Sequence, residues 1–79
     1  MNLFETVKAA VHPRMAAERY GLPIRQGSMI RCPFHADRTP SMKLNEDYFY
    51  CFGCGAYGDV IDLTAQLFRL SPADAARKL

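Results

Sequence analysis

Four residues of the metal-binding type stand as two pairs in the middle of the chain. Two residues separate Cys32 from His35 and Cys51 from Cys54, and fifteen residues separate the pairs. Thiolate sulfur and imidazole nitrogen are the ligands that hold Zn²⁺ in closed, tetrahedral structural sites. The chain has three cysteines, an odd number, which argues against a framework of disulfides. The spacing therefore predicts one structural zinc ion bound by all four residues.

The residues around each pair favour the sharp turns that a shared ion requires. Pro33 bends the first pair, and Gly53 and Gly55 flank the last cysteine. Glycine adopts the left-handed conformation of such turns without a steric cost. Two other interpretations are open. Buried thiols with a solvated histidine would make the double pair a coincidence, and a redox C-x-x-C pair would need a βαβ context that this sequence lacks.

The segment between the pairs has the pattern of a β-hairpin. Residues 41–45 (SMKLN) alternate, with Met42 and Leu44 on one face, and residues 48–52 (YFYCF) are aromatic and β-prone. The polar residues Asn45 to Asp47 predict the reversal between them. Such a hairpin returns the second pair to the first. The alternation leaves open whether Phe49 or the tyrosines on either side of it point inward.

Short helices are predicted on both sides of this hairpin. Before it, an apolar stripe around Phe4, Val7 and Val11 predicts one helix, and Pro13 opens a second over 13–20. Residues 24–34 are extended in character. After it, Asp59 and Ser71 are predicted to cap helices over 60–70 and 71–79. The prediction is a small α+β fold, one domain over residues 1–79, with an antiparallel sheet and short helices at both ends.

Charge is distributed unevenly along the chain. Residues 14–43 contain six basic and two acidic residues, whereas residues 44–68 contain four acidic residues and neither lysine nor arginine. A local basic excess of this kind favours a polyanionic partner. The eight carboxylates of the chain are spread out, while two-metal phosphoryl transfer needs them clustered. We therefore expect no catalysis by this chain alone.

The run from CPFH through TPS to CFGCG, followed by GD and an apolar helix, resembles the N-terminal zinc-binding domain of bacterial and phage DnaG-type DNA primases. The likeness extends to the upstream ERYG and to the final SPADAARKL, so it covers nearly the whole chain. It implies a zinc ribbon that recognises single-stranded template DNA and helps to start RNA primers. It also implies a separate primase catalytic domain and a replicative helicase as partners.

Single-stranded nucleic acid is bound by basic grooves and by aromatic rings on which bases stack. The residues predicted to contact DNA are Arg31, Arg38, Lys43, Tyr48, Phe49 and Tyr50. Arg38 is the first choice for a phosphate contact, because the resemblance includes its basic-Thr-Pro-Ser turn. Phe52, inside the second pair, is expected to wall the metal site.

A zinc ribbon that docks a replication protein without reading DNA is the alternative function. The acidic segment 44–68 and the uncovered last helix leave room for it. No apolar run approaches the roughly 20 residues needed to span a bilayer, and no secretory leader is recognisable at the start. We therefore expect no membrane partner and a cytoplasmic location.

Overall fold

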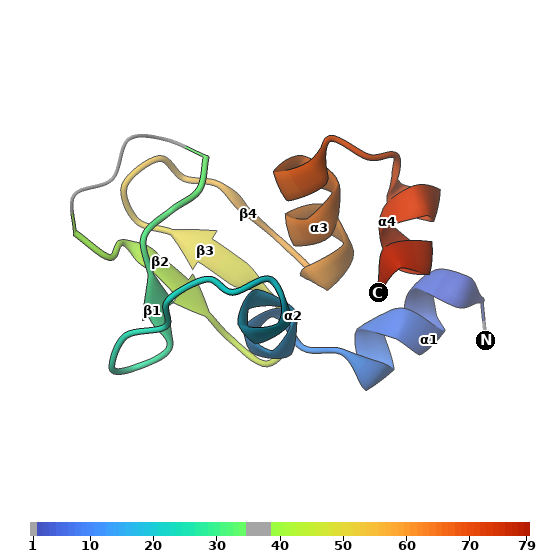
Figure 1. The fold of residues 1–79 in the computed structure, drawn as a ribbon, viewed down its shortest axis with the longest axis horizontal. Coiled ribbons are helices and arrows are strands. Elements are labelled where there is room, and N and C mark those ends of the chain that lie inside the picture. The colour runs from blue at the N-terminus through green and yellow to red at the C-terminus, as the bar shows by residue number, and fades with distance from the viewer. Residues whose placement is uncertain (1, 35–38) are drawn as a thin grey trace.

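The computed structural model describes residues 2–34 and 39–79. In these two ranges the chain forms four short helices and four short strands (Figure 1). Along the chain they are α1 (Leu3–Ala10), α2 (Pro13–Arg19), β1 (Met29–Ile30), β2 (Met42–Leu44), β3 (Phe49–Cys51), β4 (Tyr57–Gly58), α3 (Val60–Phe68) and α4 (Pro72–Lys78). The arrangement agrees with the predicted α+β fold, including the hairpin between the two cysteine pairs.

The strands form one antiparallel sheet in the order β1-β2-β3-β4. In the central hairpin Met42 lies opposite Cys51, and Leu44 lies opposite Phe49. All four of these side chains are buried. Alternation along a strand sends every second side chain to the same face, so this register makes one face of the sheet apolar and internal.

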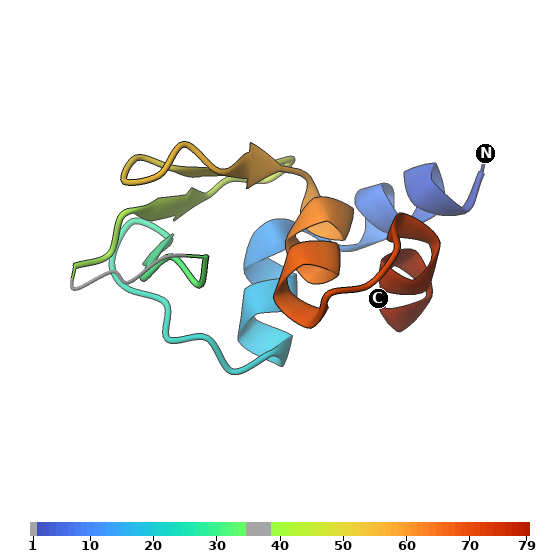
Figure 2. The ribbon, with the colours of Figure 1, turned by 90° about the horizontal axis from the view of Figure 1, so that it is seen from above.

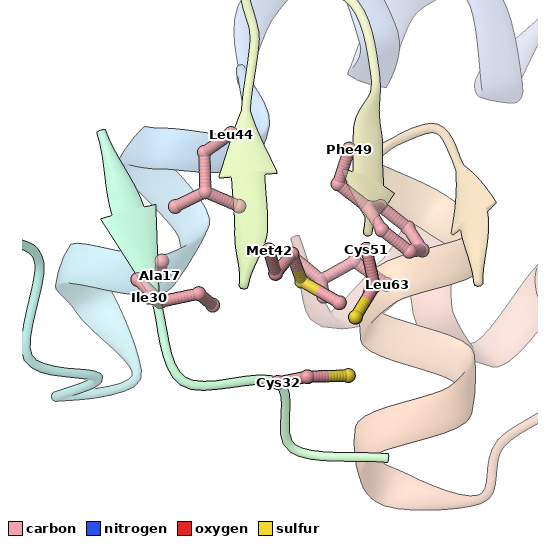
Figure 3. Close-up of a cluster of buried hydrophobic side chains, with 8 residues drawn as sticks. All are labelled: Ala17, Ile30, Cys32, Met42, Leu44, Phe49, Cys51 and Leu63. Atoms are coloured by element: carbon pink, nitrogen blue, oxygen red, sulfur yellow. The ribbon is translucent and has the colours of Figure 1, made fainter. Parts of the chain in front are cut away.

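The inner face of the sheet packs on two helices. Ala17 of α2 and Leu63 of α3 are both fully buried against it (Figure 3). The remaining buried members of this cluster come from the strands and the residues next to them, namely Ile30, Cys32, Met42, Leu44, Phe49 and Cys51. The first core therefore joins the sheet to α2 and α3, and it contains two of the three cysteines.

A second apolar cluster holds the helices to one another. It contains Val7, Val11, Ala16, Val60, Ile61, Ala75 and Ala76. Figures 1 and 2 show α1, α3 and α4 grouped at one end of the elongated molecule and the sheet at the other. The principal extents are 37 × 23 × 21 Å. No helix within the described ranges is long and apolar enough to cross a membrane.

Both predicted caps of the C-terminal helices are present. The Asp59 carboxylate accepts the Asp62 backbone N–H at 2.9 Å, and the Asp62 carboxylate accepts the Asp59 N–H at 3.0 Å. This reciprocal capping box satisfies two amides that a helix start otherwise leaves unpaired. Ser71 Oγ caps α4 by accepting the Asp74 N–H at 3.2 Å. Helix α3 ends at Phe68, before the predicted residue 70, because Arg69 adopts the left-handed conformation, with φ 55°.

Two predictions for the sheet need correction. The extended segment 24–34 contributes only the two-residue strand β1, preceded by a tight turn in which Arg25 bridges Met29. No strand is predicted for the glycine-rich stretch after Cys54, yet Tyr57–Gly58 forms the edge strand β4. Strand β4 forms because residues 57–58 pair with β3. The sequence of these two residues alone does not indicate this pairing.

Gly58 lies where β4 meets α3, and a larger residue there should loosen this junction. A Cβ atom on Gly58 would come within 2.6 Å of the Asp62 carboxylate and its Cβ. We expect Gly58→Ala to lower the free energy of unfolding by about 2 kcal/mol through overpacking and loss of the capping box. Urea unfolding of the metal-loaded chain measures it.

Gly21→Ala provides the control for this prediction. Gly21 has φ 74°, and no atom lies within 4 Å of the position its Cβ would take. This variant should therefore show only the cost of a left-handed non-glycine residue, about 1 kcal/mol. If Gly58→Ala is no more destabilising than Gly21→Ala, the collision with Asp62 does not matter.

Candidate metal centre and exposed sheet face

The three cysteine sulfurs converge at one end of the sheet. Cys51 is the last residue of β3, Cys32 follows β1, and Cys54 lies in the turn after β3. All three Sγ atoms lie within 4.8 Å of one another, and those of Cys32 and Cys54 are 3.8 Å apart. Figure 3 shows the sulfurs of Cys32 and Cys51 at the same end of the sheet. The predicted convergence of the two pairs is therefore seen for these three residues.

The sulfur positions fit a shared tetrahedral ion. Zn–S bonds of about 2.3 Å at tetrahedral angles place two thiolates about 3.8 Å apart, which is the separation between Cys32 and Cys54. A disulfide would need about 2.05 Å. Three convergent thiolates are soft donors, the type that suits Zn²⁺, Cu⁺ and iron–sulfur clusters. His35, the predicted fourth ligand, lies outside the described residues, as does Arg38.

The turn that carries Cys54 is fixed by backbone hydrogen bonds. Gly55 N–H donates to the Cys51 carbonyl at 2.8 Å, and Cys51 N–H donates to the Ala56 carbonyl at 2.8 Å. Gly55 has φ 78°, the left-handed conformation for which glycine was predicted here. Cys54 therefore lies in a turn whose backbone is held by these two hydrogen bonds.

Ser41 supports the same turn from the neighbouring strand. Its carbonyl accepts the Phe52 N–H at 2.8 Å, and its Oγ lies 3.4 Å from Cys51 Sγ. When Cys51 is a thiolate, the serine hydroxyl is the only one of these two groups that can donate. The serine of the Thr-Pro-Ser motif therefore orients the sulfur of Cys51, a role that the sequence did not reveal.

Burial makes an isolated thiolate unfavourable at this end of the sheet. The Cys32 side chain is 3% exposed. Burial raises the pKa of the Cys32 thiol to about 12, and the Cys51 and Cys54 thiols add to the increase while the Phe34 backbone opposes it. A metal ion that binds here therefore displaces protons, so its affinity falls as the pH falls.

The outer face of the sheet carries aromatic side chains. The exposed fractions are 52% for Tyr48, 38% for Tyr50, 71% for Phe52 and 72% for Tyr57. The Tyr50 and Phe52 rings meet edge to face with their centroids 5.1 Å apart. Tyr57 lies opposite Tyr50 in the β3–β4 register. These four residues, which we call the aromatic face, lie side by side on β3, β4 and the residues flanking β3.

The structure corrects two predictions about individual rings. Phe49 is fully buried, with its centroid 6.0 Å from that of Phe34, so no base can stack on it. Phe52 was expected to wall the metal site, yet it lies on the exposed face. Tyr57 was missed altogether. The two-residue spacing of Phe52 from Tyr50 could have predicted that Phe52 lies on the same exposed face. The position of Tyr57 could not have been predicted in this way, because it depends on the unexpected strand β4.

Two of the predicted cations, Lys43 and Arg31, lie within the described residues of β2 and after β1. Lys43 stands opposite Tyr50 on β2, and its ammonium donates to the Gly27 carbonyl at 2.7 Å. An ammonium has three donors, so this bond leaves two. Arg31 follows β1 and is exposed. The outer surface of the sheet therefore has aromatic rings over β3 and β4 and the Lys43 cation over β2, with Arg31 exposed just after β1.

Comparison with known proteins shows the family to which this chain is similar in sequence and fold. The sequence profile of the CHC2 zinc finger, the zinc ribbon of DnaG-type primases, matches residues 6–79. The chain belongs to this family. The CHC2 zinc finger fold is also seen in the crystal structure of the zinc-binding and RNA polymerase domains of the Aquifex aeolicus primase. That structure matches 99% of this chain with a TM-score of 0.81 and 27% identity.

Curated relatives support the same assignment. The DNA primase of Rickettsia bellii is 50% identical over 50 residues, which cover 61% of this chain and 8% of the relative. The DNA primase of Borreliella burgdorferi is 41% identical over 66 residues, which cover 78% of this chain and 13% of the relative. The chain also spans only 20% of the Aquifex chain, and it corresponds to the zinc-binding part and not to the RNA polymerase domain.

Ser41→Ala should weaken the metal site without unfolding the chain. Groups that hydrogen-bond to metal ligands typically contribute about 10- to 100-fold to metal affinity. We expect metal to pass to a chromophoric chelator about ten times faster from this variant, because Cys51 Sγ loses the hydroxyl at 3.4 Å.

Ser71→Ala is the matched control, because it also removes a hydroxyl hydrogen bond but at the start of α4. It should lower stability and leave metal transfer unchanged. Equal transfer rates for the two variants would show that Ser41 has no special role at the sulfur.

Proposed function

We propose that residues 1–79 form one zinc-ribbon domain in which Cys32, His35, Cys51 and Cys54 hold a single structural Zn²⁺. The ion would join the chain leaving β1 to the turn after β3. The three convergent sulfurs carry this proposal, together with membership of the CHC2 family. With four protein ligands the site would be closed, which is the arrangement of structural zinc and not of catalytic zinc.

We propose that this domain binds single-stranded template DNA for a primase and supports the initiation of RNA primers. The observation that carries the proposal is the aromatic face next to the cations of β1 and β2. Exposed rings accept bases of any sequence, and cations hold the backbone, which is how single strands are commonly bound. The four exposed rings on this face of the sheet are outside the apolar core, so core packing does not explain their presence.

The contacts we propose differ from those predicted from the sequence alone. Arg31, Lys43, Tyr48 and Tyr50 remain, and Arg38 remains on the basis of its motif. Phe49 is removed because it is buried, and Phe52 and Tyr57 are added because they are the two most exposed of the large apolar side chains in the described residues.

The surrounding machinery is part of the same proposal. Nucleotidyl transfer would come from a separate primase catalytic domain, and a replicative helicase would be a further partner, in the cytoplasm where template DNA is available. The domain would add binding energy and position to a reaction that it does not catalyse. The resemblance of the zinc-binding part to primases supports this division of labour.

One observation favours the alternative, a protein-docking module. Helix α1 exposes Leu3 and Phe4, at 47% and 36%, on the layer of helices away from the aromatic face. Exposed apolar side chains on a helix are a common basis for docking. Because the two surfaces are separate, substitutions on each distinguish the two functions.

Elemental analysis of the purified chain should give one zinc per molecule. A strong chelator should abolish the circular dichroism of the folded state, since structural zinc contributes about 10 to 16 kcal/mol in comparable small sites. Acidification should release the ion as protons compete for the sulfurs. A chain that stays folded at neutral pH after complete removal of metal would contradict the proposal.

Fluorescence anisotropy with a labelled single-stranded oligonucleotide tests the DNA proposal. Each phosphate contact adds about −0.7 to the slope of log affinity against log salt, so three contacts predict a slope of about −2. Phe52→Ala and Tyr57→Ala should each weaken binding about tenfold, because stacking on one ring contributes about 1 to 3 kcal/mol per base.

Phe68→Ala provides the control, because Phe68 is 42% exposed but lies at the end of α3. It should bind DNA as the parent chain does. If no binding is seen at low salt, or if all three aromatic variants behave alike, the docking module becomes the better explanation. In that case substitutions at Leu3 and Phe4 are the next to examine.

A further inference from the structure

A small cavity lies beside β1, at the edge of the sheet opposite β4. It measures about 150 Å³ and is lined by Leu22, Pro23, Arg25, Ile30 and Arg31. Drug-sized ligands occupy pockets of roughly 300 to 1,000 Å³. The cavity is therefore suited to a single small unit. Three of its five lining residues are apolar and two are cationic.

The two arginines of this cavity have no carboxylate partner in the described ranges. Elsewhere in the same ranges Arg14 pairs with Glu18 at 3.3 Å, and Arg77 pairs with Asp74 at 3.2 Å. Arg25 and Arg31 form no such pair there. Guanidinium groups bind phosphate oxygens through paired N–H donors, so two of them at one cavity favour a phosphate.

The apolar part of the lining suits the remainder of a nucleotide. Leu22 is partly buried against the core of the sheet, whereas Pro23 is exposed at the rim. Neither offers a side-chain hydrogen bond, so together they select for a flat or apolar group and not for a sugar hydroxyl. A nucleotide combines such a group, its base, with the phosphate that the arginines favour.

Strand register connects this cavity to the aromatic face. Paired residues in neighbouring strands point to the same face of a sheet. A continuous row of such pairs runs from β4 to the cavity through Tyr57, Tyr50, Lys43, Met29 and Arg25. A single strand stacked on the rings could therefore follow the row across the sheet and reach Arg25.

We propose that the cavity beside β1 is a nucleotide-binding site, in which Arg25 and Arg31 hold one phosphate and Leu22 and Pro23 receive the attached base. This inference rests on the proposed DNA binding and adds a defined position to it. The nucleotide belongs either to the bound single strand or to a free mononucleotide, and the two sources share the same chemistry.

The test uses the zinc-loaded chain, salt titration by anisotropy and a double-mutant cycle. Arg25→Gln, Arg31→Gln and the double variant are compared with Arg77→Gln, which removes the same charge from α4. If the two arginines hold one phosphate, each single variant should lower affinity about tenfold. The double variant should lose little more than either, with a salt slope less steep by about 0.7 in total.

A second variant tests the apolar wall without truncating the core. Pro23→Glu places a carboxylate at the exposed rim, where it should pair with the arginines and repel phosphate, and its effect should resemble that of the double arginine variant. Titration with a deoxymononucleotide, followed by the methyl NMR signals of Leu22 and Ile30, identifies the source. Shifts at low millimolar concentration indicate a free nucleotide, and shifts only with the oligonucleotide indicate the strand.

Each other outcome overturns the proposal in a distinguishable way. Additive arginine effects, with the slope less steep by about 1.4, would mean two separate backbone contacts and no shared phosphate. Unchanged binding in the arginine variants, with binding still lost in Phe52→Ala, would reject the cavity and leave the DNA proposal intact. If neither ligand shifts the methyl signals and no oligonucleotide binds, both proposals fail.

Discussion

The register of β2 against β3 determines what each face of this small sheet can do. With Lys43 opposite Tyr50, Phe49 and Cys51 face the core and Tyr50 faces solvent. A slip of one residue would send every side chain of a strand to the other face. The tyrosine ring would then be buried and the Cys51 sulfur would point away from Cys32. The metal centre and the aromatic face therefore depend on the same pairing.

Strands of two or three residues cannot hold such a register by their own hydrogen bonds. The inner face is fixed by Leu63 and Ala17, which pack against it from two helices. Ser41 adds a hydrogen bond beyond the strand end, where its carbonyl accepts the Phe52 N–H. A chain of this length buries only about 60% of its unfolded surface, so packing alone leaves a small surplus of stability. A metal ion that joins the residues after β1 to the end of β3 would oppose a slip in the register of the strands.

The sequence predicted correctly those features that depend on residues close together along the chain. The Asp59 and Ser71 caps, the Pro13 helix start and the hairpin all follow from residues adjacent in sequence, and the structure contains each of them. The direction of the alternation in β3 does not follow from the sequence, because it depends on which face meets Leu63. The edge strand β4 and the exposure of Tyr57 depend on the same contacts between distant segments. Nothing in the local pattern of Pro23 or Arg25 indicates a cavity.

Phe52 links the two halves of the proposed function. Its backbone lies between Cys51 and Cys54, while its ring stands on the outer face against Tyr50. Because the turn from 51 to 56 is closed by its own hydrogen bonds, an ion that orders the sulfurs also fixes the position of this ring. Fixing a ring before a base arrives lowers the entropy lost on binding. The zinc would then contribute to DNA affinity through the ring it positions, without contacting the nucleic acid.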